Sequence, residues 1–124
     1  MEKIKIITEF GQFEAEILNK NPKTVASILE SLPFEAEAGR WGDEIYFEIP
    51  VIGELEEEQE VVGVGDLAFW PEGSAFCIFF GLTPNSEPDK IKPASAVNVF
   101  ARTKDNLNFL KEMKDGDKIK VVRV

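Results

Sequence analysis

The chain has 124 residues, of which 44% are hydrophobic and 30% are charged, and its formal net charge at pH 7 is −9. This length suits a single core, so we expect one domain over residues 1–124. The acidic balance, without a local cluster of Lys and Arg, disfavours nucleic acid and membrane surfaces as partners, because phosphates are repelled. A lone cysteine excludes an internal disulfide, and no apolar run approaches the roughly 20 residues that span a bilayer. We therefore expect a cytoplasmic protein.

The first third of the chain predicts two strands followed by a helix. Residues 3–8 alternate charged and apolar side chains, and residues 13–17 do so again after a turn at Gly11, as half-buried strands do. The period then changes, because Asn21 suits a helix N-cap, Pro22 suits the first helical position, and Pro33 ends the segment. The apolar stripe of this helix consists of Val25, Ile28, Leu29 and Leu32.

The remaining elements are short strands separated by irregular segments. We expect strands at residues 43–49, 61–62, 67–70, 76–80, 97–102 and 118–124, and a short helix over residues 105–114. The run from Glu54 to Glu60 is interpreted as a solvated loop, and residues 83–93, which hold three prolines, as an irregular one. Seven or eight short strands with one early and one late helix indicate a closed barrel with helical plugs.

Three segments in the same order resemble the cyclophilin family: "GQFEAEILNKNPKTVASILESL", "GSAFCIFFG" and "VNVFARTKDNLNFLKEM". The closer resemblance is to a small prokaryotic cyclophilin-like family of unassigned function, through "RWGDEIYF", "GDLAFWPEGSAFCIFFG" and "PASAVNV". The resemblance implies a mainly β fold, a closed eight-stranded antiparallel β-barrel with two short helices capping its ends. It also raises peptidyl-prolyl cis/trans isomerase as a candidate activity.

Prolyl isomerisation needs an apolar pocket and a fixed hydrogen-bond donor that stabilises the twisted amide, whose rotation barrier is about 20 kcal/mol. In cyclophilins the donor is an arginine, and the resemblance makes Arg40 the catalytic candidate. The alternative for Arg40 is an ion pair with Asp43 or Glu44. A pocket aromatic of the family falls on Cys77, and this chain has no histidine. The resemblance therefore implies absent or weak isomerase activity.

The aromatic residues divide into two groups. Phe69, Phe76, Phe79 and Phe80 lie in predicted strands, where core packing is favoured over ligand contact. Trp41 and Trp70 lie beside Gly or Pro at strand ends, which suits the wall of a partly open pocket. A joint pocket of Arg40, Trp41, Trp70 and Phe76 is predicted. The full set of candidate ligand-binding residues is Trp41, Trp70, Phe76, Cys77 and Phe79.

Other chemistries are disfavoured. Cys77 and Ser74 lack a histidine base, and zinc sites usually recruit His and Cys. The run of glutamates has no defined pattern of metal ligands, so neither a metal nor a cofactor is expected. Three functions stay open: a binding module for a proline-containing peptide or small ligand, an atypical prolyl isomerase using Arg40, and a partner subunit of an amide-hydrolysing enzyme complex. The oligomeric state is not predicted.

Overall fold

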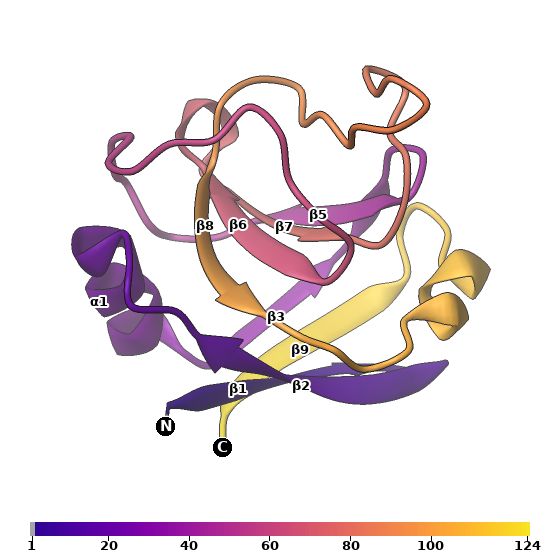
Figure 1. The fold of residues 1–124 in the computed structure, drawn as a ribbon. Helices are drawn as coiled ribbons and strands as arrows, with labels where there is room; N and C mark the ends of the chain where they lie inside the picture. The colour runs from indigo at the N-terminus through magenta and orange to yellow at the C-terminus, as the bar shows by residue number, and fades with distance from the viewer. Residues whose placement is uncertain (1) are drawn as a thin grey trace.

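The computed structural model describes residues 2–124, and its sheet closes almost completely into a barrel (Figure 1). The order of the nine strands in the sheet is β3-β9-β1-β2-β8-β6-β7-β5-β4, with every neighbouring pair antiparallel. The predicted antiparallel barrel is therefore confirmed, with one strand more than expected. The strands are β1 (Lys3–Thr8), β2 (Gly11–Ile17), β3 (Phe34–Glu37), β4 (Gly39–Arg40), β5 (Glu44–Glu48), β6 (Asp66–Trp70), β7 (Ala75–Phe79), β8 (Asn98–Arg102) and β9 (Lys118–Arg123).

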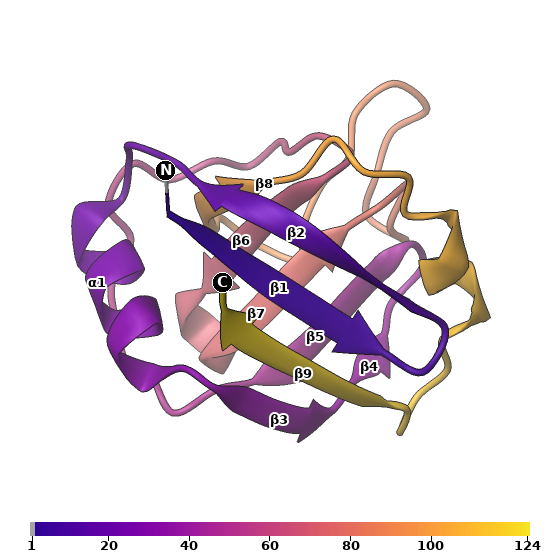
Figure 2. The same ribbon diagram turned by 90° about the horizontal axis from the view of Figure 1, so that it is seen from below.

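The barrel interior is a packed core. Strands β1, β2 and β9 form one wall, and β5, β6 and β7 form the opposite wall (Figure 2). Phe76 lies between them, where its ring stacks on Phe47 at 4.9 Å and meets the ring of Phe100 edge-on at 5.2 Å. Both arrangements are favourable for aromatic pairs, so the inward side chains of the strands fill the barrel.

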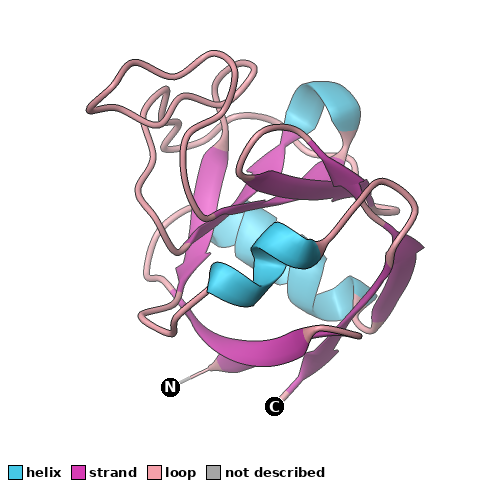
Figure 3. Cartoon of the chain, turned by 90° about the vertical axis from the view of Figure 1, so that its right-hand side faces the viewer, coloured by secondary structure: helices cyan, strands magenta, loops and turns pink. Residues whose placement is uncertain are grey.

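Helical segments cover both open ends of the barrel, as expected. Helix α1 (Pro22–Ser31) lies at one end and the 3-10 helix η2 (Asn108–Glu112) at the other (Figure 3). The second segment is shorter than the helix predicted over residues 105–114, but Leu107, Leu110 and Met113 are buried as their spacing indicated. No helix among residues 2–124 is long and apolar enough to cross a membrane.

The N-terminus of α1 is capped by the glutamate run rather than by the predicted Asn21 side chain. Asn21 occupies the N-cap position but makes no side-chain cap. The Glu56 carboxylate instead accepts hydrogen bonds from the backbone nitrogens of Lys23 (3.0 Å) and Thr24 (2.9 Å) and from Oγ1 of Thr24 (2.6 Å). Glu57 accepts another from the Asn21 nitrogen at 2.9 Å. Because carboxylates are stabilised at a helix N-terminus, these two glutamates of the expected loop also hold the start of α1, although Glu57 is exposed and Glu56 is half-buried.

Two long segments, residues 49–65 and 80–97, lie on the outer side of the wall that contains β5 to β8 (Figure 1). The 3-10 turn η1 (Pro71–Gly73) joins β6 to β7 within this region. The strand predicted at residues 61–62 is only an isolated bridge, in which Val62 pairs with Ile91. These segments bring residues far apart in the chain together over the outer face of the sheet.

Candidate functional site

The wall of β5, β7 and β6 carries a separate apolar cluster on each face. Directly paired residues of antiparallel strands share a face, and Cys77 pairs with both Tyr46 and Ala68, while Trp70 pairs with Ala75. These residues point away from the barrel interior. The outer-face cluster consists of Val62, Ala68, Ala75, Cys77, Phe79, Ile91, Val97 and Val99, with Leu18 and Trp70 packed against it.

Strand alternation separates the candidate residues of β7. Phe76 belongs to the barrel interior, whereas Cys77 and Phe79 belong to the outer-face cluster. Both outer residues are buried, with exposed fractions of 1% and 0%. Both side chains therefore lie beneath the segments that cover this face and are not accessible to solvent.

Trp70 lies at the margin of the outer-face cluster and is half-buried. Its Nε1 donates a hydrogen bond to Oγ of Ser95 at 2.6 Å, and the Ser95 hydroxyl in turn donates to the Glu72 carboxylate. Gly73 makes room for the indole, because a Cβ there would lie 2.5 Å from a ring carbon. The indole is thus fixed between η1 and the segment before β8.

A cavity of about 430 Å³ adjoins this position. Three of its eight lining side chains are apolar, one is the serine that holds Trp70, and the other four are polar or charged. Its lining residues are Glu60, Val61, Asn85, Lys90, Lys92, Pro93, Ala94 and Ser95. The cavity therefore combines a small apolar part with a mainly polar and charged lining.

The guanidinium of Arg40 is engaged in bonds within the chain. Its Nε donates to the carbonyl of Gly42 (2.8 Å), and its Nη1 donates to the carbonyls of Lys111 (2.6 Å) and Met113 (3.2 Å). Its Nη2 pairs with the Asp43 carboxylate at 3.0 Å. The ion pair with Asp43, predicted as the alternative role of Arg40, is present, and these bonds tie β4 to η2.

The four residues of the predicted joint pocket do not meet. Arg40 pairs with Ile45 at one end of β5, whereas Trp70 pairs with Ala75, which faces the other end of β5. Phe76 is enclosed by the barrel interior. Trp41 is half-buried in the turn before β5, where its nitrogen and carbonyl bond the backbone of Glu44. Strand register and alternation, rather than nearness in sequence, keep these side chains apart.

Glu44 is a buried acid on the outer face. It pairs with Phe79, its side chain is among the buried polar groups with 6% exposed, and its Oε1 has no hydrogen-bond partner among residues 2–124. Burial raises the pKa of Glu44 to about 7, and the nearby Cys77 thiol offsets part of this rise. Burial also raises the pKa of that thiol, and the adjacent Glu44 raises it further, so Cys77 is not an activated nucleophile.

The sequence alone does not predict the burial of Glu44, which it offers only as an alternative ion-pair partner of Arg40. Alternation within β5 does place Glu44, Tyr46 and Glu48 on one face. Only the pairing of Glu44 with Phe79, together with the covering segments, distinguishes it from the exposed Glu48.

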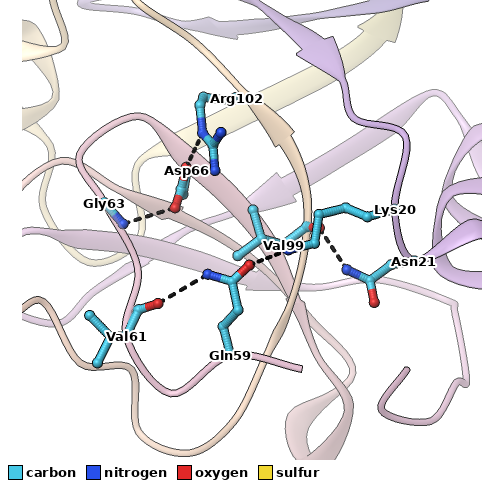
Figure 4. Close-up of polar contacts among 8 residues, drawn as sticks. All are labelled: Lys20, Asn21, Gln59, Val61, Gly63, Asp66, Val99 and Arg102. Atoms are coloured by element: carbon cyan, nitrogen blue, oxygen red, sulfur yellow. Dashed lines mark hydrogen bonds and ion pairs between the residues drawn. The ribbon is translucent and has the colours of Figure 1, made fainter. Parts of the chain in front are cut away.

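Polar contacts fasten the segment that follows the glutamate run over this face (Figure 4). Lys20 donates to Oε1 of Gln59 at 2.5 Å, and the Gly63 nitrogen donates to Oδ2 of Asp66 at 2.8 Å. The other oxygen of Asp66 binds Nε of Arg102 at 2.6 Å. Among residues 2–124, no group of three or more His, Cys, Asp or Glu is placed to hold a metal ion.

Comparisons with known proteins agree with this architecture. The family described as cyclophilin-like matches residues 2–122. The solution structure of a hypothetical protein from Archaeoglobus fulgidus is similar, with a TM-score of 0.84 and 42% sequence identity over 99% of this chain and 95% of that one. No curated protein matches the chain.

Proposed function

Because the chain belongs to the cyclophilin-like family, we propose that it binds a proline-containing peptide or a small ligand on the outer face of the barrel, with absent or weak prolyl isomerase activity. The observation that carries this proposal is the outer-face cluster. It is a second apolar cluster, separate from the barrel interior, and segments without regular strands cover it.

The cavity beside Trp70 supports a ligand with an apolar ring. Its wall includes Val61, Pro93 and Ala94, and the nearby indole is a flat apolar surface held by Ser95. A proline ring is compact and has no N–H donor when it follows another residue in a peptide. Such a ring fits an apolar wall, while the polar rim provides partners for the flanking peptide groups.

The surroundings of Arg40 support binding over efficient catalysis. A catalytic donor must be free to bond the amide as it twists. The guanidinium of Arg40 already donates to three carbonyls and one carboxylate. It also lies 5.6 Å from the ring centre of Phe80, in a cation–π contact. Releasing it for a substrate would break these contacts.

Tryptophan fluorescence tests the site, because the chain has only two tryptophans. We expect Xaa-Pro peptides to change the fluorescence of Trp41→Phe, which retains Trp70, and to leave that of Trp70→Phe almost unchanged. Equal responses from the two variants, or no response in the wild type, would contradict the proposed site.

A protease-coupled assay tests the catalytic part. We expect a rate of Xaa-Pro isomerisation at or slightly above the uncatalysed rate. A large acceleration that Arg40→Ala abolishes would replace this proposal with an Arg40-dependent prolyl isomerase. A large acceleration unaffected by Arg40→Ala would indicate an isomerase with another donor.

A further inference from the structure

Two exposed apolar side chains border a cavity beside the start of α1. Ile52 is 95% exposed and Leu55 is 40% exposed, and both line a cavity of about 320 Å³. Val51 and Phe69, which are buried, belong to the same lining. Single apolar residues on a surface are ordinary, but two that border one partly apolar cavity form a candidate contact surface. We call Ile52, Leu55 and this cavity the Ile52 surface.

Buried polar side chains hold the segment that carries this surface in place. The side-chain nitrogen of Asn98 donates to the carbonyl of Glu54 at 2.9 Å, and its side-chain oxygen accepts from the nitrogen of Glu56 at 3.0 Å. The side-chain oxygen of Asn21 accepts from the nitrogen of Glu57 at 2.7 Å. Both asparagines are fully buried. The backbone of this segment is therefore fixed from within, so a partner meets a preorganised surface.

The outward direction of Ile52 is set by its two neighbours in the chain. Val51 is buried, and its nitrogen donates to the carbonyl of Ile49 at 2.8 Å. Gly53 lies against Phe69, since a Cβ at Gly53 would be 3.3 Å from a ring carbon. Ile52 is thus exposed on an anchored segment and forgoes the stabilisation that burial of an isoleucine gives. Contact with a partner would restore that burial.

Acidic side chains surround the Ile52 surface. Residues 54–60 include five glutamates. Two of them hold the start of α1, as described above, whereas the other three are exposed and form no ion pair among residues 2–124. Among the described residues that line the cavity, only Lys23 is a cation. Charge complementarity therefore favours a partner that is positively charged around its apolar contact.

We propose that the Ile52 surface docks a partner protein through a segment in which apolar side chains are flanked by Lys or Arg. An apolar side chain of the partner packs against Ile52 and Leu55 in the cavity, and the flanking cations face the exposed glutamates. The cavity beside Trp70 shares no lining residue with this one. The proposal therefore stands whether or not the barrel binds a proline-containing ligand.

Three synthetic hexapeptides test this chemistry: Ac-KKLLKK-NH₂, Ac-EELLEE-NH₂, which reverses the charge, and Ac-KKSSKK-NH₂, which removes the apolar side chains. Each is titrated into the protein while NMR follows the methyl signals of Ile52 and Leu55. We expect the first peptide to shift both signals saturably and to bind at least about tenfold more tightly than either of the others. Equal affinity for either control peptide, or no saturable shift with the first, would overturn the proposal.

Ile52→Ser provides a test within the protein, because so exposed a side chain can be replaced with little effect on folding. This variant should bind Ac-KKLLKK-NH₂ about tenfold more weakly than the wild type. The matched control is Val64→Ser, which replaces another exposed apolar residue outside the lining of this cavity and should keep the wild-type affinity. Equal affinities of the two variants would contradict the assigned surface.

The same NMR spectra distinguish the other occupants. Shifts confined to the indole of Trp70 would place the peptide at the proposed ligand site and overturn the docking surface, while leaving the proposed function intact. Methyl signals of Ile52 that change with protein concentration in the absence of peptide would show that a second copy of this chain covers the surface. That result would also overturn the proposal of a basic partner.

Discussion

Glu44 and Glu56 are acidic side chains in opposite surroundings, and the contrast shows what decides the role of a carboxyl group here. Glu56 lies in the glutamate run, where the start of α1 supplies three hydrogen-bond donors. Glu44 lies on the outer face of β5, where one of its oxygens has no partner among residues 2–124. One carboxyl group caps a helix, and the other is enclosed without a full set of hydrogen bonds.

The two environments shift the pKa values in opposite directions. For Glu44, burial raises the pKa to about 7. For Glu56, desolvation also acts upward, but hydrogen bonds from Thr24 and Lys23 outweigh it and hold the pKa below its ordinary value. The stability of the protein should therefore depend on pH in opposite senses through these two groups.

The largest expected effect comes from Glu44. Because its folded pKa of about 7 exceeds the ordinary 4.5, the folded state retains a proton that the unfolded state has lost between these values. The contribution of Glu44 to the free energy of unfolding is fully present below pH 4.5 and is lost as the pH rises through 7. The loss amounts to about 3 kcal/mol of unfolding free energy. Urea denaturation at pH 5 and pH 8 should show this fall in the wild type and in Glu48→Gln, but not in Glu44→Gln. An equal change in unfolding free energy between pH 5 and pH 8 in all three proteins would show that Glu44 ionises normally.

The next effect comes from removing the cap of α1. Glu56→Ala leaves the first helical N–H groups without their acceptor and should lower the unfolding free energy by about 1–2 kcal/mol. Glu58→Ala is the matched control, since it removes an exposed glutamate from the same run and should change stability little. Denaturant midpoints at pH 7 measure both. Equal midpoints for the two variants would mean that the contacts of Glu56 contribute no net stability.

The smallest effect is the acid dependence of the same cap. Because the folded pKa of Glu56 is lowered, its contribution is present above pH 4.5 and is lost as the pH falls through the folded value. Between pH 5 and pH 3, the midpoint temperature of thermal unfolding should therefore fall less steeply in Glu56→Gln than in the wild type. The control is again residue 58, where Glu58→Gln should keep the wild-type slope. A steeper slope in Glu56→Gln would reverse the sign assigned to this group.

Much of the fold was predictable because local pattern and tertiary packing agree. The alternation in residues 3–8 and 13–17 and the apolar stripe of α1 point to one core, and the structure buries Ile4, Ile6, Phe13 and Ile28 there. The ion pair of Arg40 with Asp43, one of the two given as the alternative to a catalytic role, also forms, because the two residues lie three apart in the chain. Local patterns therefore predicted these strands, this helix and this ion pair, although the side-chain cap expected from Asn21 does not form.

The candidate site was less predictable because its residues meet through long-range pairing. Alternation does not tell which face of β7 points into the barrel, so the sequence predicts Phe76 and Cys77 in one ligand-binding set, whereas the structure places them on opposite faces. The partners of Glu56, more than 30 residues away, gave no local signal. Long-range pairing also determines that Glu44 is enclosed and Glu48 is not.

The sequence by itself determined the amphipathic periods, the acidic surface, the cyclophilin-like resemblance and the lack of a histidine base. The tertiary structure alone decided which carboxyl group is fully hydrogen-bonded and which has an oxygen without a partner. The reason is that burial and hydrogen bonding depend on the register of distant strands. Glu44 and Glu56 are the same residue type in one acidic chain. Their positions in the folded barrel give them different burial and different hydrogen-bond partners.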